Sequence, residues 1–258
     1  MSFRRVDASS DADALVRYLN AAAENLVELK ASVSERLALS NGARVLELGC
    51  GAGHDVEYLR ARGCLVIGLE TSRTMLAASA TRLGSPEGLV QASGAGLPFR
   101  EDSLDAVRIE RVLQHVAAPA TVLAEVRRVV RGGGGVAVLE PDWSTLSLHS
   151  RFVDVSQAIR ETICAGSRQP VIGRELRGLL VEVGFDDVSV EIDTPAWTDF
   201  ATVNRILQLP RLVERAQRMG LVTAAEIAAW LRDLHELSAS GGFFASVNRV
   251  IAWRPIGQ

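Results

Sequence analysis

The sequence predicts an α/β protein built on a doubly wound, mostly parallel sheet. Short apolar runs alternate with stretches of helical spacing up to Glu140, and this alternation is typical of βαβ units. Gly63, Gly84 and Gly132 follow the helical stretches, and glycine commonly ends a helix. A chain of 258 residues, 48% of them hydrophobic, is long enough for one such core with additions.

The alternating part of the chain is expected to hold five strands and three helices. The strands are the apolar runs at residues 44–48, 65–70, 88–92, 104–110 and 135–140. Between them, apolar residues recur three and four positions apart in helices at residues 55–62, 72–82 and 119–130. The glycines at 132–135 are expected to form the turn before the fifth strand.

The alternation of strands and helices ends on either side of this region. Residues 11–39 read as two helices, and residues 143–170 are mixed and partly helical. A clean amphipathic helix at 171–183 and a strand at 187–193 follow, then helices at 200–208, 211–219 and 224–237 and a last strand at 243–253. We therefore expect an N-terminal helical segment, 1–40, and one domain, 41–258, with helical insertions at about 143–170 and 198–241.

Charge and cysteine usage limit the partners and the compartment. A net charge of −3 gives no general attraction to phosphate backbones, so no nucleic-acid partner is expected. No apolar run approaches the roughly 18 residues that cross a bilayer, so no membrane span is expected. The 3 cysteines have no CxxC spacing and leave an odd thiol, which favours a reducing, cytoplasmic location. The sequence leaves the oligomeric state open and shows no metal-ligand motif.

The strongest local pattern is an apolar strand that runs into a glycine-rich turn, Gly49 to Gly53, and then into a helix. Glycine permits positive φ and close approach of a ligand, and the free N–H groups of a helix start suit an anionic group. Glu70 ends the second strand about 20 residues after Glu47, where a nucleotide-binding sheet places its ribose ligand. The alternative is a tight turn that binds nothing.

The spacing distinguishes between cofactors. A dinucleotide-binding turn needs its third glycine at position 54, which is His54 here. An NAD(P)-dependent oxidoreductase is therefore the weaker interpretation.

Several motifs, in this order, resemble the class I S-adenosylmethionine-dependent methyltransferases, especially the group of ubiquinone/menaquinone-biosynthesis and small-molecule methyltransferases. The resemblance is strong over about residues 42–141. The matching blocks are residues 47–53, residues 68–72 with Met75, residues 97–99, residues 104–107 and residues 129–134.

This resemblance implies a seven-stranded Rossmann-like methyltransferase fold with helical lid insertions, and S-adenosylmethionine as cofactor. It also implies a set of cofactor-binding residues: Tyr18, Glu47, Gly49, Gly51, Glu70, Thr71, Ser93, Gly94, Glu110 and Arg111. Ser93 stands where the family usually has an acidic residue that accepts a hydrogen bond from the adenine amine. The glycine run 132–135 lacks the family's usual proline.

No catalytic base is assigned from the sequence. His115, His149 and Asp142 are candidates, each with a structural alternative as a packing, surface or turn residue. Arg111 either holds the cofactor carboxylate or pairs with Glu110.

The substrate is expected to be a small, largely apolar acceptor, methylated on oxygen, nitrogen or carbon, in specialised-metabolite biosynthesis. The N-terminal segment and the insertions are expected to act as a lid, with Tyr18, Trp143, Trp197 or Phe200 contacting cofactor or acceptor. The alternative is that these aromatic residues pack into the insertions' own core. A non-catalytic S-adenosylmethionine-binding regulatory or scaffold protein is the other function that remains open.

Overall fold

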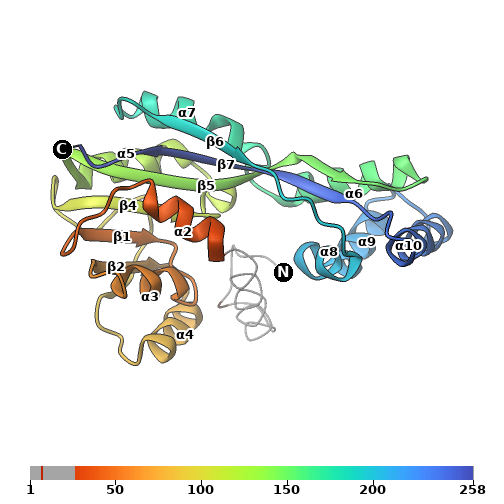
Figure 1. The fold of residues 1–258 in the computed structure, drawn as a ribbon, viewed down its shortest axis with the longest axis horizontal. Coiled ribbons are helices and arrows are strands. Elements are labelled where there is room, and N and C mark those ends of the chain that lie inside the picture. The colour runs from red at the N-terminus through yellow and green to blue at the C-terminus, as the bar shows by residue number, and fades with distance from the viewer. Residues whose placement is uncertain (1–6, 8–26, 258) are drawn as a thin grey trace. The chain divides into compact units, whose positions relative to one another are not determined.

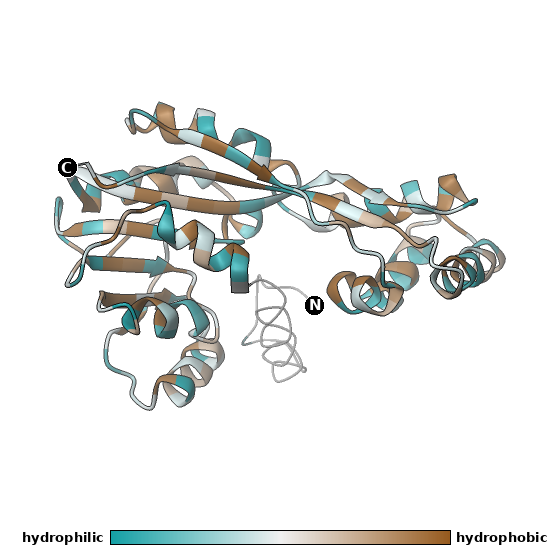
Figure 2. Cartoon of the chain, in the orientation of Figure 1, coloured by the Kyte–Doolittle hydropathy of each residue, from teal (hydrophilic) through white to brown (hydrophobic). Residues whose placement is uncertain are grey.

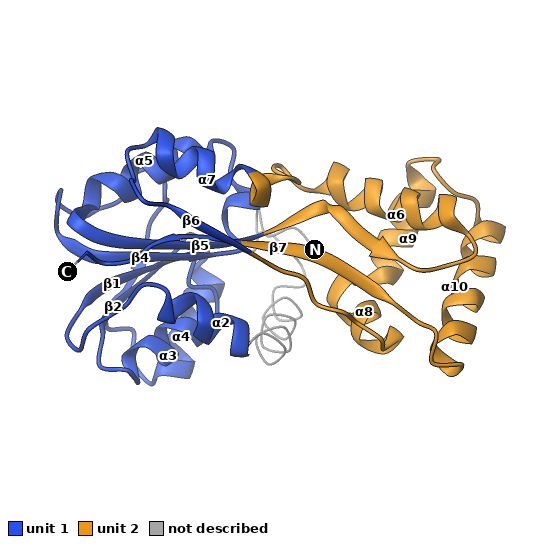
Figure 3. Cartoon of the chain, turned by 45° about the horizontal axis from the view of Figure 1, so that its top comes forward, with its two compact units in different colours: residues 1–140, 175–191, 251–258 blue, residues 141–174, 192–250 orange. Residues whose placement is uncertain are grey.

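A computed structural model describes residue 7 and residues 27–257. Two compact units divide the chain (Figure 3). Unit 1 is made of residues 1–140, 175–191 and 251–258, and unit 2 of residues 141–174 and 192–250. Both predicted helical insertions fall within unit 2, and their assignment as lids stays a prediction.

The described residues form a seven-stranded sheet with the order β3-β2-β1-β4-β5-β7-β6 (Figure 1). The registers of β1 with β2 and β4, of β2 with β3 and of β4 with β5 are all parallel. The strands are β1 (Arg44–Leu48), β2 (Leu65–Glu70), β3 (Leu89–Gln91), β4 (Leu104–Glu110), β5 (Val130–Leu148), β6 (Ser189–Asp193) and β7 (Ala245–Arg254). This architecture confirms the predicted fold class.

Helices cover both faces of the sheet in unit 1: α3 and α4 lie on one side, and α5 and α7 on the other (Figure 3). Along their length the helices alternate hydrophobic with hydrophilic residues (Figure 2), as helices that bury one face do. Unit 1 contains α2 (Val27–Glu35), α3 (His54–Arg60), α4 (Arg73–Leu83), the short 3-10 helix η2 (Leu113–His115), α5 (Pro119–Val129) and most of α7 (Ile172–Glu182). Unit 2 contains α6 (Val153–Gly166), α8 (Phe200–Leu207), α9 (Leu209–Arg218) and α10 (Ala224–Ala239).

The core of unit 1 explains why β1 reads as an apolar run. Val45 is fully buried between strands and packs with Val33 of α2 and Leu59 of α3. Buried β-branched and leucine side chains on both faces of parallel strands are typical of a sheet that helices cover on both sides. The parallel strands β1 to β5 therefore place their carboxyl ends along one edge of the sheet.

Unit 2 has a separate apolar core. Phe200, Trp230 and Phe243 are buried in it, and Trp143 and Trp197 pack against it. The ring of Phe200 lies 4.6 Å from that of His235 and 5.7 Å from that of Phe243, both edge-on. Three of the four aromatic residues proposed as lid contacts are thus placed in this core, and Tyr18 lies outside the described residues.

The fifth strand differs most from its prediction. It begins at Val130 rather than at residue 135, and it runs on to Leu148. Leu104 pairs with Val130 and Ala106 with Gly135, so the residues between Val130 and Gly135 bulge out of the ladder. The glycine run predicted as a turn before the strand is therefore a bulge inside it, with Gly133 at φ 76°.

The other helices and strands lie close to their predicted bounds. Of the two helices expected in residues 11–39, α2 is described, and residues 11–26 lie outside the described residues. None of the helices in the described part of the chain is both long and apolar enough to cross a membrane.

Candidate functional site

The carboxyl ends of three adjacent strands meet around Gly49. Leu48 of β1 pairs with Leu69 of β2 on one side and with Ile109 of β4 on the other. The next residues along these strands, Glu70 and Glu110, therefore flank the glycine turn. Ligands of open α/β sheets bind at such an edge.

The turn after β1 requires glycine for steric reasons. Gly49, Gly51 and Gly53 all have positive φ, at 77°, 51° and 85°. A Cβ on Gly49 would lie 2.3 Å from Cγ2 of Val112, and one on Gly53 would lie 2.3 Å from Oγ of Ser79. The backbone N–H groups of Gly49 and Cys50 donate to the carbonyl oxygen of Leu69, at 2.7 and 3.0 Å, and hold the turn against β2.

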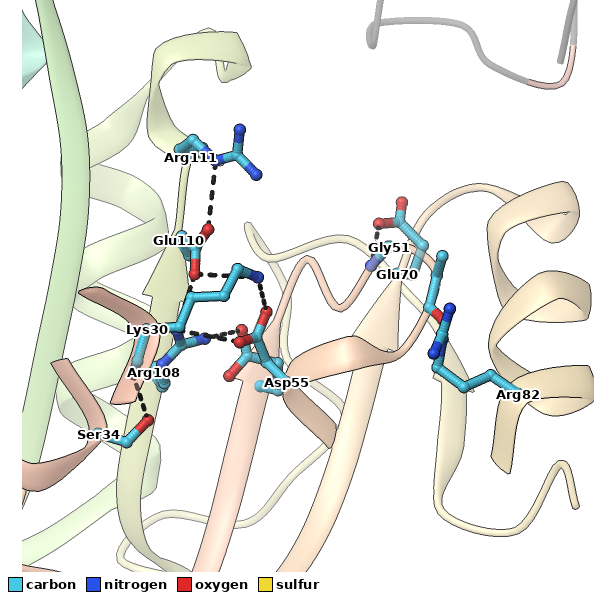
Figure 4. Close-up of polar contacts among 11 residues, drawn as sticks. Lys30, Ser34, Gly51, Asp55, Glu70, Arg82, Arg108, Glu110 and Arg111 are labelled. Atoms are coloured by element: carbon cyan, nitrogen blue, oxygen red, sulfur yellow. Dashed lines mark hydrogen bonds and ion pairs between the residues drawn. The ribbon is translucent and has the colours of Figure 1, made fainter. Parts of the chain in front are cut away.

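Glu70 connects the end of β2 to this turn. Its Oε2 accepts a hydrogen bond from the Gly51 N–H at 3.2 Å (Figure 4). Its Oε1 accepts from the N–H groups of Thr71 and Ser72 at 2.7 and 3.0 Å. The carboxylate is half-buried, so it is fixed by the backbone and still reachable by a ligand. This placement is the one that the sequence spacing predicts.

Asp7 lies next to this edge, which the sequence did not indicate. Its carboxylate accepts hydrogen bonds from Ser72 Oγ at 2.6 Å and from the N–H groups of Arg73 and Thr74 at 3.0 and 3.1 Å. The bond from Ser72, together with those from the backbone, lowers the pKa of Asp7 to about 2. Asp7 therefore supplies a cap for α4 from a distant part of the chain.

A buried ion network lies beneath the glycine turn. Arg108 of β4 is fully buried, and its guanidinium contacts three carboxylates. The distances are 2.8 Å to Oε1 of Glu47, 2.7 Å to Oε2 of Glu110 and 3.2 Å to Oδ1 of Asp55. Charges buried this deeply persist only when they are paired, so the network ties β1, β4 and the start of α3 together.

Lys30 and Arg111 extend the network on two sides (Figure 4). The ammonium group of Lys30 lies 2.6 Å from Oδ2 of Asp55 and 3.4 Å from Oε2 of Glu110. Nε of Arg111 lies 3.2 Å from Oε1 of Glu110, which is one of the two roles predicted for Arg111.

The surroundings of the two glutamates of the network shift their pKa values in opposite directions. Burial raises the pKa of Glu47 to about 8, although Arg108 partly opposes this shift. Burial acts in the same direction on Glu110, but the positive charges of Lys30 and Arg108 outweigh it and hold its pKa well below the ordinary value. Burial and the neighbouring cations thus shift the pKa values of these two glutamates in opposite directions. Because Glu47 is buried and bonded to Arg108, its predicted part in cofactor binding remains a proposal.

The loop after β3 is held by α5. Ser93 Oγ accepts from the N–H of Ala95 at 3.2 Å, and Glu125 Oε2 accepts from the N–H of Leu97 at 2.7 Å. Arg128 donates to the carbonyl oxygens of Leu97 and Phe99 at 3.0 and 2.9 Å. Next to Ser93, a Cβ on Gly94 would lie 3.2 Å from Cγ1 of Val122, so the loop packs closely on α5.

The three candidate bases lie in different surroundings. His115 is half-buried in η2, which follows β4 in unit 1. Glu140 fixes the start of this short helix, because its Oε1 accepts from the N–H groups of Val112 and Leu113 at 2.6 and 2.5 Å. His115 is therefore close in sequence and structure to the end of β4.

The other two candidates belong to unit 2. Asp142 is only 3% exposed, and its carboxylate accepts from Arg174 Nε at 2.5 Å and from Ser144 Oγ at 2.6 Å. These bonds fit a structural anchor. His149 is exposed, and its backbone N–H donates to the carbonyl oxygen of Phe244 at 2.9 Å.

Cys50 is buried in the turn, and burial raises the pKa of its thiol well above the ordinary value. A thiol that stays protonated is a poor nucleophile, which fits a small turn residue. Among residue 7 and residues 27–257, no group of three or more His, Cys, Asp or Glu residues could hold a metal ion.

The comparisons with known proteins place the central region in a known family. Residues 46–138 match the family described as a methyltransferase domain. An uncharacterized 37.1 kDa protein in transposon Tn4556 of Streptomyces fradiae is 35% identical over 224 residues, which are 84% of this chain and 64% of that protein. An uncharacterized methyltransferase of Synechocystis sp. is 31% identical over 155 residues, which are 58% of this chain and 70% of that protein.

A solved structure shares the fold. Phosphoethanolamine N-methyltransferase 2 of Haemonchus contortus, in complex with S-adenosyl-L-methionine, aligns with a TM-score of 0.61 and 16% identity over 99% of this chain and 60% of that one. The chain spans less than two thirds of the length of the first curated relatives that it matches, from 38% to 64%.

Proposed function

The chain belongs to the class I S-adenosylmethionine-dependent methyltransferases, and from this premise we propose that it transfers a methyl group from S-adenosylmethionine to a small, largely apolar acceptor. The observation that carries the proposal is the position of Glu70. Its carboxylate is fixed by the backbone at the end of β2, half-exposed, and adjacent to the N–H of Gly51. Two neighbouring hydroxyl groups of a ribose suit such a carboxylate.

The residues at this edge fit the cofactor. The absence of a side chain at Gly51 permits close approach of a ligand to the backbone, and its positive φ angle favours glycine there. We assign the ribose to Glu70 and Thr71, and the adenine to Ser93 and Gly94. The hydroxyl of Ser93 accepts a hydrogen bond from an adenine amine without the charge that an acidic residue would add.

When bound, the cofactor supplies a methyl group that is already activated by its sulfonium, so the reaction is an in-line displacement. The chain's own task is then to hold the reacting groups in line and to exclude water. The ion network of Arg108 supports this task by fixing the ends of β1 and β4 relative to each other. Glu110 and Arg111 stand at the end of β4, and we assign them to the amino-acid part of the cofactor.

His115 is the candidate that we favour if the acceptor must lose a proton. It lies in η2, which Glu140 anchors directly after β4. Asp142 is engaged by Arg174 and is the weaker candidate. Tyr18 lies outside the described residues, and its contact with the cofactor remains a prediction.

The test of this function uses S-adenosylmethionine with a deuterated methyl group and a panel of small phenols, quinols, amines and carboxylic acids of graded polarity. Label should appear, by mass spectrometry, in an apolar small molecule, with one S-adenosylhomocysteine formed for each methyl group transferred. His115→Ala should lower kcat without weakening cofactor binding. Label found only in protein or RNA substrates would contradict the proposed acceptor class.

A further inference from the structure

Glu140 is a fully buried glutamate of β5 that lies beside the end of β4. In the parallel register, Glu110 of β4 pairs with Leu139 of β5. The N–H of Arg111 then donates to the carbonyl oxygen of Leu139 at 2.9 Å. Glu140, the next residue of β5, therefore adjoins the turn by which the chain leaves β4.

The backbone of this turn needs support from outside. Arg111 has a φ of 54°, in the left-handed region that residues other than glycine rarely adopt. Strained backbone of this kind persists only where the surrounding structure holds it. The helix η2 that follows is a single turn, in which the N–H of His115 donates to the carbonyl oxygen of Val112 at 2.9 Å. One turn of 3-10 helix is too short to be stable by itself.

The carboxyl group of Glu140 provides this support. Its Oε1 accepts hydrogen bonds from the N–H groups of Val112 and Leu113, at 2.6 and 2.5 Å. These are donors that the start of a helix leaves without a partner inside the helix. Val112 precedes η2 and has no polar side chain, so the helix has no cap from its own cap residue. A residue 28 positions further along the chain takes that role.

Stability alone does not explain a carboxyl group at this position. Oε2 of Glu140 is buried and has no hydrogen-bond partner within the part of the chain that the structure describes. Burial also raises the pKa of Glu140 to about 8, although the backbone bonds at the start of η2 and the charge of Arg111 act in the opposite direction. An apolar residue would avoid both costs. The bonds to η2 are what only a hydrogen-bond acceptor contributes here.

We propose that Glu140 is a positioning residue of the methyltransfer site, whose bonds to η2 fix the place of His115 and thereby control turnover. His115 is half-buried and ends η2, two residues after Leu113. Because the residues of a single helical turn move together, a displacement of the capped N–H groups is passed on to His115. A displacement of about 1 Å in a reacting group can lower a rate about a hundredfold. This inference rests on the proposed function, since it needs His115 to receive a proton from the acceptor.

Amide hydrogen exchange tests the cap without any ligand. Glu140→Met removes the acceptor at a similar side-chain length, and Glu140→Gln keeps an acceptor oxygen. By NMR, the amide hydrogens of Val112 and Leu113 should exchange at least about tenfold faster in Glu140→Met and at nearly the wild-type rate in Glu140→Gln. If Glu140→Met does not fold, Glu140→Ala gives the same comparison, since it leaves space for water beside the two N–H groups. Unchanged exchange would show that the packing of Leu113 holds η2, and would overturn the inference.

Kinetics tests whether the cap acts through His115. The acceptor is the compound of the panel above that wild-type protein methylates fastest. Glu140→Met should lower kcat at least about tenfold, and Glu140→Gln should keep it within about threefold of wild type. The Kd of S-adenosylhomocysteine should change less than about twofold in both variants, because the cap lies outside the residues assigned to the cofactor. In the His115→Ala background, Glu140→Met should lower kcat less than about twofold further, since residues that act as a unit are not additive.

Glu226→Met is the matched control. Glu226 caps α10 in unit 2, where its Oε2 accepts from the N–H of Thr223 at 2.7 Å. This substitution also removes a carboxyl group that caps a helix. It should leave kcat and the amide exchange of Val112 and Leu113 unchanged.

Other results of these measurements would overturn the inference. Additive effects of Glu140→Met and His115→Ala, or a Kd of S-adenosylhomocysteine that rises as much as kcat falls, would show that Glu140 does not act through His115. Wild-type kcat in Glu140→Met, with faster amide exchange, would show that the cap is only structural. In these cases the proposed function stands, because wild-type protein still transfers methyl groups. If wild-type protein methylates no compound of the panel, the proposed function fails, and the inference fails with it.

Discussion

Arg108→Met is expected to lower the free energy of unfolding by about 3–5 kcal/mol, because it leaves buried carboxylates without their main cation. Arg108 is fully buried and contacts Glu47, Asp55 and Glu110. A methionine side chain fills much of the same volume, so the loss reports on charge more than on packing. Urea denaturation followed by circular dichroism measures it.

The stability lost in Arg108→Met should increase with pH. Without Arg108, the pKa of Glu47 rises further above its value in the unfolded chain, and Glu110 loses one of the cations that lower its pKa. A group whose pKa is raised on folding stabilises the protein fully below its unfolded pKa, and this contribution is lost as the pH rises through the folded pKa. The deficit of Arg108→Met should therefore be larger at pH 8 than at pH 5.

Arg218→Met is the control for this variant. Arg218 is 71% exposed and lies 4.0 Å from Glu214, one turn earlier in α9. Loss of such a surface pair changes stability by less than about 1 kcal/mol. If Arg108→Met were no more destabilising than Arg218→Met at pH 8, the ion network would not hold the strand ends together.

Gly51→Val is expected to abolish cofactor binding. Gly51 has a φ of 51° and donates its N–H to Glu70 at 3.2 Å. A β-branched side chain there is strained by about 1–3 kcal/mol and enters the space that the ligand needs. The loss of S-adenosylhomocysteine binding, measured by calorimetry, should far exceed what the loss of stability explains.

Gly84→Val is the control that distinguishes backbone strain from obstruction of the ligand. Gly84 ends α4 with a φ of 70°, and a Cβ there would meet nothing within 4 Å. The two substitutions should destabilise the fold by similar amounts, but only Gly51→Val should abolish binding. Tight binding by Gly51→Val would show that the turn is only structural.

The site could be predicted from sequence where its signals are local. The turn of Gly49 and Gly51 is a run of strand, glycines and helix within ten residues, and Glu70 follows from the length of one βα unit. Neither position depends on contacts between distant segments, so the local sequence pattern is sufficient to predict both.

The ion network could not be predicted, because it depends on strand register. Arg108 reads as one polar residue in an apolar run, and Lys30 as one polar residue of a helix. Only the pairing of Leu46 with Val107, and thus of Glu47 with Arg108, shows that the charges of Glu47 and Arg108 meet. An arginine in the middle of a buried parallel strand was the one available signal.

The fifth strand was misjudged for a related reason. Four glycines in a row are a local turn signal, but pairing with β4 continues on both sides of them, at Val130 and Gly135. Asp7 was missed because its partner Ser72 is 65 residues away. Contacts between distant segments thus account for what sequence analysis did not find.

Calorimetry of S-adenosylhomocysteine with wild-type protein and Glu70→Ala tests the central claim most directly, because this carboxylate is assigned to the ribose. Wild-type protein should bind S-adenosylhomocysteine and S-adenosylmethionine but not NAD or NADP. Glu70→Ala should raise the Kd at least about tenfold with an unchanged circular dichroism spectrum, since charge-assisted bonds contribute roughly 1.5–3 kcal/mol each. An unchanged Kd in Glu70→Ala, or binding of NAD(P) in place of S-adenosylhomocysteine, would contradict the account.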